Sequence, residues 1–222
     1  MLSVKSFLFS ILLSLCCISL SFANTVPEPQ RILEKTSTEM LQLFMEKSDD
    51  ISKDPEIAHT LIREHLISKI NFKLMSRWVL GSNWKKSTPE QQQEFVIVFK
   101  ELVIKFYSKA LLEYLSKYEL EPGLISFKPF AGKIKGKYTT IRSLINPPGG
   151  AEPINVNYDM YHNKAGQWQV YDISIEGISL VTSYRSSFKK VIKEQGMDAL
   201  LSQLREKTLK LNEPAIASNK TQ

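Results

Sequence analysis

Apolar residues recur every three or four positions through much of the first half of the chain. This spacing places them on one face of a helix, whereas alternation with polar residues indicates a strand. The pattern predicts helices over about 30–48, 54–66 and 71–80. The second begins at Asp54-Pro55-Glu56, where aspartate caps the helix and proline occupies a position whose missing N–H costs nothing.

A longer helix is predicted from Thr88 to about Tyr118. It opens with Thr88-Pro-Glu-Gln91, a capping box with proline at the first helical position. One apolar stripe runs from Phe95 to Tyr114, and a second runs from Ile97 to Tyr118. A helix that is apolar on two sides is buried between layers or lines a cavity with one of them.

The second half of the chain begins with the period-two alternation of strands. We expect strands at about 124–131, 134–146, 153–163 and 167–176. Short connections rich in Gly, Pro and Asn separate them, which favours antiparallel neighbours in a meander. Two helices, at about 178–194 and 197–211, close the chain.

These elements predict an α+β fold: a twisted, four-stranded antiparallel meander covered by several helices. A curved sheet with helices across it can enclose an apolar cavity rather than a filled core. We expect a single domain over residues 24–211 and a flexible tail over residues 212–222.

Residues 1–23 differ in character from the rest and are predicted to be a secretory signal peptide. Lys5 is their only charge, Phe7 to Leu20 is a short apolar run, and Ser21-Phe22-Ala23 suits a cleavage site. The mature protein would start at Asn24. Lipidation of the paired cysteines within this segment would require a small residue before the modified one, and neither Leu15 nor Cys16 is that residue.

The chain is mildly basic, with 29 Lys and Arg against 23 Asp and Glu. This balance could favour anionic headgroups or acidic partner surfaces, and it is also compatible with ordinary solubility. The lysines are dispersed and no basic stripe with interleaved aromatics accompanies them. Nucleic acid is therefore not an expected partner.

Motifs for metal and nucleophilic chemistry are absent from the sequence. The three histidines are His59, His65 and His162, and the first two lie on different sides of a predicted helix. Neither Cys-x-x-Cys nor His-Glu-x-x-His occurs, so no metal site is expected. The Gly-x-Ser-x-Gly elbow of serine hydrolases is also missing.

One enzymatic alternative remains, an acid–base isomerase or hydratase with a sheet-lined pocket. Asp172, Glu176, Tyr171 and His162 lie close together in the last two predicted strands, and a buried carboxylate beside a tyrosine can transfer protons. Asp172 and Glu176 could instead brace the strand-to-helix junction, since a helix N-terminus stabilises carboxylates. We expect no catalytic residue and a protein that is not an enzyme.

Four sequence islands resemble the MlaC family of periplasmic phospholipid-binding proteins, also called toluene-tolerance proteins. They are Val79–Lys85, Thr88–Gln92, Trp168–Asp172 and Glu176–Val181, and they occur in the family's order. The resemblance covers about residues 30–211. It implies a nuclear-transport-factor-like sheet with additional helices, in agreement with the elements predicted from periodicity.

The resemblance also implies a function and partners. Members hold a glycerophospholipid as cargo, with its tails inside, and require no cofactor. The resemblance implies a periplasmic carrier that transfers lipid between an outer-membrane lipoprotein–porin complex and an inner-membrane ABC transporter with a hexameric lipid-binding subunit. This transport maintains the lipid asymmetry of the outer membrane.

Periodicity and the resemblance together suggest which side chains line a lipid cavity. The predicted sheet wall comprises Ile141, Ile145, Val156, Tyr158, Met160 and Val170. The predicted helical wall comprises Met75, Val79, Phe99, Val103, Phe106, Ile178 and Val181. Alternation breaks near Tyr171, where a β-bulge would shift the faces.

Basic side chains outside the predicted core are candidates for polar contacts. Arg77, Arg142 and Arg185 could donate to a lipid phosphate or pair with local acids. Two lysine clusters could guide docking to an acidic partner surface, or could form a solvated face. The hairpin cluster is Lys133, Lys135 and Lys137, and the helix cluster is Lys189, Lys190 and Lys193.

Overall fold

The computed structural model describes residues 26–211. The predicted signal peptide and the predicted tail at 212–222 lie outside these residues. The helices are α2 (Glu28–Glu46), α3 (Ser48–Lys53), α4 (Glu56–His65), α5 (Phe72–Leu80), α6 (Pro89–Leu115), α7 (Leu180–Gln195) and α8 (Met197–Lys210). The short 3-10 turns η1 (Ile67–Lys69) and η2 (Gly81–Lys86) connect α4 to α5 and α5 to α6, and η3 (Pro148–Gly150) lies between two strands of the sheet.

The sheet is an antiparallel meander with strand order β1-β2-β3-β4-β5. Its strands are β1 (Ile125–Phe127), β2 (Tyr138–Ile145), β3 (Ile154–His162), β4 (Trp168–Ile175) and β5 (Ile178–Ser179). The α+β class is confirmed, but the prediction of four strands was wrong by one. Glu176 and Gly177 adopt positive φ angles of 48° and 78°, so the chain reverses and Ile178 pairs with Ile175 before α7 begins.

A β-bulge interrupts the pairing of β3 with β4, as the broken alternation predicted. Asp159 pairs with Asp172 and Met160 pairs with Val170, which leaves Tyr171 as the extra residue. An extra residue shifts every later side chain to the opposite face. Val170 and Ile173 therefore both pack in the cluster beneath α2, although they are three positions apart and would lie on opposite faces of a regular strand.

The long helix α6 begins as its sequence predicted. The Thr88 hydroxyl accepts a hydrogen bond from the Gln91 N–H at 3.2 Å, and the Gln91 side chain accepts one from the Thr88 N–H at 3.1 Å. This reciprocal capping satisfies N–H groups that have no partner inside the helix. The helix ends at Leu115, three residues before the predicted end at Tyr118.

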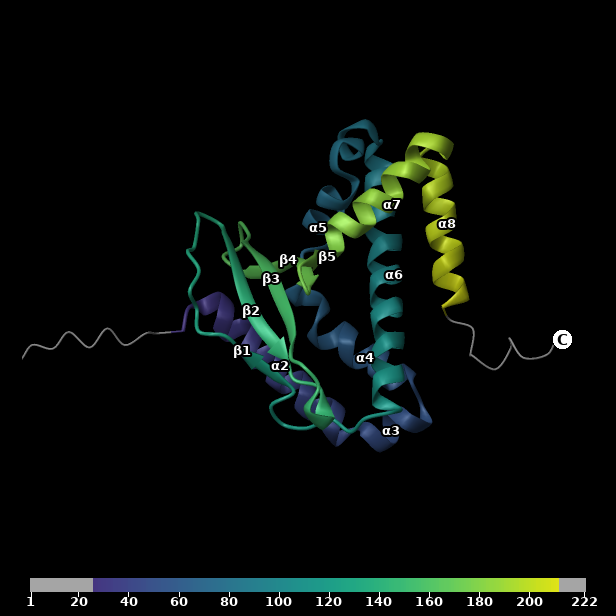
Figure 1. The fold of residues 1–222 in the computed structure, drawn as a ribbon. Coiled ribbons are helices and arrows are strands. Elements are labelled where there is room, and N and C mark those ends of the chain that lie inside the picture. The colour runs from purple at the N-terminus through teal and green to yellow at the C-terminus, as the bar shows by residue number, and fades with distance from the viewer. Residues whose placement is uncertain (1–25, 212–222) are drawn as a thin grey trace, which may run out of the picture.

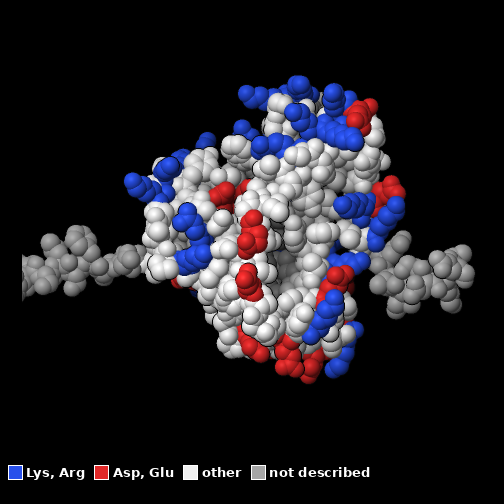
Figure 2. Space-filling view, in the orientation of Figure 1, with Lys and Arg blue, Asp and Glu red and all other residues white. Residues whose placement is uncertain are grey.

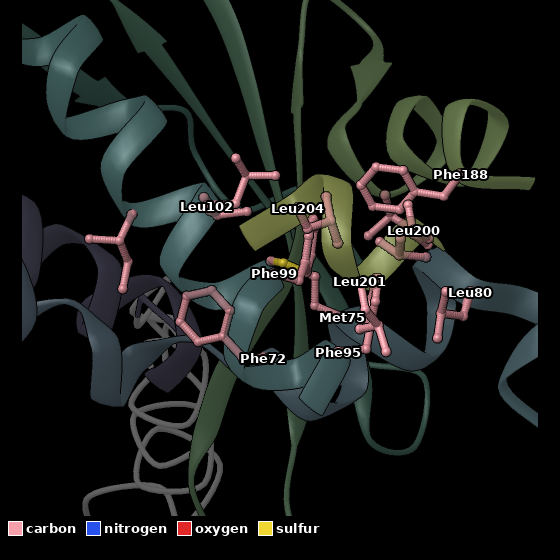
Figure 3. Close-up of a cluster of buried hydrophobic side chains, with 14 residues drawn as sticks. Phe72, Met75, Leu80, Phe95, Phe99, Leu102, Phe188, Leu200, Leu201 and Leu204 are labelled. Carbon is pink, nitrogen blue, oxygen red and sulfur yellow. The ribbon is translucent and has the colours of Figure 1, made fainter. Parts of the chain in front are cut away.

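The helix α6 lies between the sheet and α8, with α7 crossing above (Figure 1). Its first half packs in an aromatic core with α5, α7 and α8, where the Phe95 and Phe99 rings stack at 5.3 Å and both contact Phe188 (Figure 3). Its last turns pack instead against α2, α3 and α4. Neighbours cover α6 on more than one side, so residues of both apolar stripes are buried, although Ile97 and Phe106 remain 52% and 42% exposed.

Candidate functional site

A large apolar cavity lies between the inner face of the sheet and the helices α4 to α7. Its volume is about 760 Å³, within the range of pockets that hold small-molecule ligands. The surface is hollowed between the sheet and α6 in the view of Figure 2. Ile178, at the edge of this cavity, is 70% exposed, which places it at the mouth.

A second cavity of about 290 Å³ extends from the first toward α2 and β1. Leu66, Ile70, Leu111, Tyr158 and Ile173 line both cavities. Since these five side chains border both volumes, the two cavities are adjacent, and we refer to them together as the branched space, with a large and a small branch. A branched space suits a ligand with more than one long apolar group.

Charged side chains are almost absent from the lining of this space. Among the described residues, Glu176 is the one ionisable side chain other than tyrosine that lines the large branch, and Lys69 is the one that lines the small branch. The Glu176 carboxylate is engaged by the backbone and side chain of Asn155. The interior therefore offers apolar burial and little to attract a charged group.

Seven of the predicted cavity residues line the branched space. Met75, Val103, Ile145, Val156, Tyr158 and Ile178 line the large branch, and Val170 and Tyr158 line the small one. The other six lie elsewhere. Val79, Phe99 and Val181 pack in the aromatic helical core, Ile141 and Met160 pack in the cluster beneath α2, and Phe106 is 42% exposed.

Several lining residues were not among those predicted. The segment from α4 into η1 supplies Ile62, Leu66, Ile67 and Ile70, and the later half of α6 supplies Tyr107, Ser108 and Leu111. The apolar spacing of the sequence at 54–66 places Ile62 and Leu66 on one face of that helix. Periodicity shows that a face is buried, but it does not identify the element or cavity that the face meets.

The residues of the proton-transfer alternative take part in structural contacts. The Asp172 carboxylate accepts hydrogen bonds from the Val181 N–H at 3.0 Å and from the Ser179 hydroxyl at 2.5 Å, which braces the start of α7. The His162 ring packs on Trp168 with centroids 4.9 Å apart. Neither Asp172, Tyr171 nor His162 is among the residues that line the branched cavity.

Tyr171 lies in an aromatic group beside β3. The centroid of its ring lies 6.3 Å from that of Trp78 and 5.9 Å from that of Tyr138. Burial raises the pKa of Tyr171 to about 12, with the nearby Asp159 carboxylate adding to the effect. The phenol therefore stays protonated at neutral pH, where it is a poor base.

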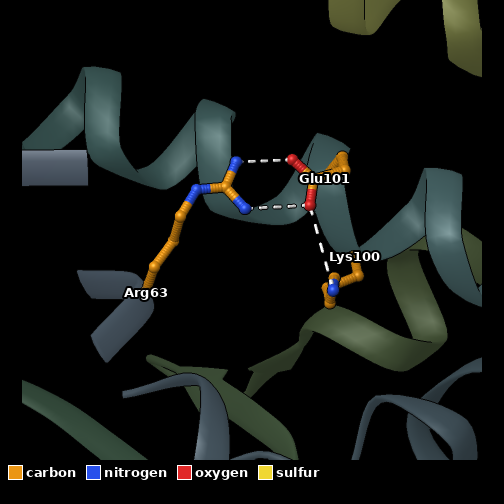
Figure 4. Close-up of polar contacts among 3 residues, drawn as sticks. All are labelled: Arg63, Lys100 and Glu101. Atoms are coloured by element: carbon orange, nitrogen blue, oxygen red, sulfur yellow. Dashed lines mark hydrogen bonds and ion pairs between the residues drawn. The ribbon is translucent and has the colours of Figure 1, made fainter. Parts of the chain in front are cut away.

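An ion pair joins two walls of the cavity, α4 and α6 (Figure 4). Arg63 donates to both carboxylate oxygens of Glu101, at 3.1 and 2.6 Å, and Lys100 lies 3.9 Å from one of them. The hydrogen bonds from Arg63 lower the pKa of Glu101. This contact holds the outward face of α4 against α6, while the inward face of α4 lines the cavity.

Arg185, one of the three arginines that could donate to a lipid phosphate or pair with a local acid, contacts Trp78. Its Nε donates to the Trp78 carbonyl at 2.7 Å, and its guanidinium lies 5.9 Å from the centre of the Trp78 ring.

Within residues 26–211 no three His, Cys, Asp or Glu side chains are grouped as metal ligands would be. No helix in that same part of the chain has the length and apolar character needed to span a membrane.

The fold and the branched space define a class of α+β proteins that enclose an apolar pocket between a sheet and helices. The family model for MlaC proteins matches residues 34–206. That match extends over most of the sequence, and the chain belongs to the MlaC family.

Two relatives are about a quarter identical in sequence to this chain. The intermembrane phospholipid transport system binding protein MlaC of Haemophilus influenzae is 26% identical over 180 residues, which cover 80% of this chain and 81% of that protein. The toluene tolerance protein ttg2D of Pseudomonas putida is 25% identical over 171 residues, 77% of this chain and 75% of that protein.

A solved structure shows the same fold with a ligand. It is the phospholipid-binding protein from Ralstonia solanacearum in complex with a phospholipid. The two structures superpose with a TM-score of 0.73 and are 26% identical in sequence. The match covers 84% of this chain and 100% of the Ralstonia solanacearum chain.

Proposed function

We propose that this protein binds a glycerophospholipid and carries it through the periplasm. The branched apolar cavity is the observation that carries the proposal, and the phospholipid held by the Ralstonia solanacearum relative supports it. Burial of one CH₂ contributes roughly 0.8 kcal/mol, so two long acyl chains correspond to on the order of 20 kcal/mol of exposure to water. A carrier must supply apolar burial of that size.

The acyl chains would occupy the two branches, while the headgroup would remain at the mouth. Within residues 26–211, no lysine or arginine lines the large branch, which supports this orientation because a buried phosphate would lack a cationic partner. Secretion through the segment at 1–23, cleaved near Ala23-Asn24, would place the carrier in the periplasm. This part of the proposal rests on sequence alone.

The proposed partners are an outer-membrane lipoprotein–porin complex and an inner-membrane ABC transporter with a hexameric lipid-binding subunit. Transport between them would maintain the lipid asymmetry of the outer membrane. All six lysines of the hairpin and helix clusters are exposed, and basic residues gather in two regions of the face in Figure 2. Transient docking depends on such charged rims more than on large apolar patches.

Lipid extraction and mass spectrometry of natively purified protein test the binding proposal. We expect bound phospholipid in the wild type and its loss in Val103→Asp and Val156→Asp, because both side chains are buried in the cavity wall. Ile97→Asp is the matched control in α6, since Ile97 is 52% exposed. Full retention of lipid by both cavity variants would show that the tails lie elsewhere.

Charge reversal of each lysine cluster tests the docking proposal. We expect slower lipid delivery to the inner-membrane complex, a stronger dependence on salt, and unchanged bound lipid. Crosslinking from Lys135 and Lys190 in cells would locate the partner on the same surfaces. Delivery that is unaffected by reversal of both clusters would assign the lysines to a solvated face.

A further inference from the structure

Ser108 carries a buried hydroxyl without a partner in the wall of the large cavity. The residue is 1% exposed, and its Oγ makes no hydrogen bond within residues 26–211. Serines elsewhere in the cavity wall satisfy their hydroxyls locally: Ser183 donates to the Ser179 carbonyl at 2.8 Å, and Ser187 donates to the Ser183 carbonyl at 3.2 Å. An unpaired buried hydroxyl is costly. The Ser108 Oγ is covered by its neighbours, so a ligand would gain this donor if a rotation of the side chain turned it toward the cavity.

Two tyrosines, Tyr107 and Tyr184, line the same cavity as Ser108. Tyr107 precedes Ser108 on α6, and Tyr184 lies on α7. Burial raises the pKa of Tyr184 to about 12, and the nearby Tyr107 adds to this shift, so the two phenols are neighbours. The Tyr184 ring is held by Phe99 and Phe188, with centroids 5.1 and 5.3 Å away, which orients its hydroxyl.

We propose that Ser108, Tyr107 and Tyr184 form a polar subsite that donates hydrogen bonds to the ester carbonyl oxygens of an acyl lipid. The proposal rests on the proposed function and adds to it a preference for ester-linked chains. Three hydroxyl donors call for a ligand that presents acceptors. The ester carbonyls are the acceptors that lie between the headgroup and the tails.

The position of the subsite favours an ester over a charged acceptor. Tyr107 is 39% exposed and Ser108 is 1% exposed, so these two adjacent residues lead from the surface into the buried wall of the cavity. A phosphate or a fatty-acid carboxylate at this depth would be a buried anion. The lining of the large branch, as far as the structure describes the chain, contains no lysine or arginine to pair with such an anion.

The experiment compares phosphatidylglycerol with two ester-linked chains and its diether analogue of the same chain length. Ether oxygens are poor acceptors and lack the carbonyl, while headgroup and tails stay the same. Lipid-free protein is equilibrated with vesicles of each lipid, and retained lipid is measured. We expect the wild type to prefer the diester by about fivefold, the effect of one net hydrogen bond.

Ser108→Ala and Tyr184→Phe each remove one donor, and we expect both to reduce this preference. Ser108→Ala should also raise the melting temperature of lipid-free protein, because it removes an unpaired buried hydroxyl. Ser76→Ala is the matched control: Ser76 is also buried, at 0% exposure, and unpaired, but it is not part of the cavity lining. It should raise the melting temperature and leave the lipid preference unchanged.

Equal retention of diester and diether by the wild type, with both bound, would overturn the subsite and leave the proposed function standing. The same conclusion would follow if the preference persisted in both Ser108→Ala and Tyr184→Phe. A preference for free palmitate over both lipids would replace the ester by a carboxylate and also overturn the subsite. Failure of the wild type to retain either lipid would contradict the proposed function itself, and the subsite with it.

Discussion

The carboxylate of Asp172, near the end of β4, accepts a hydrogen bond from the backbone N–H of Val181, in the first turn of α7. The first N–H groups of a helix have no partner within it, and a carboxylate at that end also interacts favourably with the helix dipole. A side chain of the sheet therefore satisfies the start of a helix that forms part of the cavity wall. The contact bridges the tight turn at Glu176 and Gly177, so it fixes the angle between β4 and α7.

Replacement of Asp172 by alanine should destabilise the protein without removing an activity. The variant loses three hydrogen-bond partners, which are the N–H groups of Ile173 and Val181 and the Ser179 hydroxyl. We expect the free energy of unfolding to fall by about 2 kcal/mol, since a buried charged acceptor is lost. Urea denaturation followed by circular dichroism measures the change.

Asp198 provides the control, because its carboxylate accepts from Gln91 in an exposed contact. Asp198→Ala should change the unfolding free energy by about 0.5 kcal/mol or less. A phospholipase assay on wild type and Asp172→Asn distinguishes the two roles of Asp172. Turnover by the wild type that disappears in the variant would revive the proton-transfer alternative and contradict the carrier.

Local sequence patterns predicted most of the elements because each depended on neighbours in the chain. The capping box at Thr88, the helix start at Asp54 and the bulge at Tyr171 are all local features, and the structure contains each of them. The strand at Ile178 was missed because its pairing depends on the positive φ of Glu176. A glutamate in that conformation is uncommon, and sequence periodicity does not reveal it.

The cavity could be predicted only in part, for a physical reason. Residues such as Phe99 and Val103 share the apolar pattern of α6, but Phe99 packs against Phe95 and Phe188 while Val103 borders open space. The difference lies in how far the neighbouring helices stand from α6. That spacing is a tertiary property, so it cannot be inferred from the period of one helix.

Asp159 should make stability depend on pH in a defined direction. Burial raises its pKa, the hydroxyl of Thr140 opposes this shift by a hydrogen bond of 2.6 Å, and the Asp172 carboxylate adds to it. When the pKa of a carboxyl group is higher in the folded state than in the unfolded state, its contribution to stability is greatest at pH values below the unfolded pKa. That contribution is lost as the pH rises through the folded-state pKa. At neutral pH the ionised Asp159 is therefore destabilising.

Asp159→Asn keeps an acceptor for Thr140 and removes the charge. We expect a higher melting temperature than wild type at neutral pH, and a gain that disappears at about pH 3, below the ordinary pKa of aspartate. Differential scanning calorimetry across this range measures both. A gain that is constant with pH would attribute the effect to packing rather than to ionisation.

The Arg63–Glu101 pair should stabilise the α4 wall modestly and in a salt-dependent way. The side chains are 42% and 26% exposed, so solvent screens the pair and the expected coupling is about 0.5–1 kcal/mol. Arg63 lowers the pKa of Glu101, so this contribution is present above the unfolded pKa and is lost as pH falls through the folded one.

A double-mutant cycle with Arg63→Met and Glu101→Gln measures this coupling at low and high salt. The exposed pair Lys35–Glu39, at 3.7 Å within α2, is the control and should couple more weakly. A coupling that is absent at low salt would show that the bidentate contact does not hold α4 against α6.

Leu111 lies where the two branches of the cavity meet, and filling this position should shorten the acyl chains that the protein retains. Leu111 lines both branches, so Leu111→Trp would narrow their junction. The larger ring leaves the mouth at Ile178 unchanged and reduces the depth available beyond the junction. We expect mass spectrometry of bound lipid to show a shift toward shorter chains, with a total amount close to that of the wild type.

Leu112→Trp is the matched control, since Leu112 is the next residue of α6 and lines neither branch. Strain from an oversized side chain costs about 1–3 kcal/mol at either position, so both variants should lose some stability. Only the substitution at the junction should change the length distribution. Identical distributions in wild type, Leu111→Trp and Leu112→Trp would mean that the acyl chains do not pass Leu111 and that the small branch stays outside the lipid site.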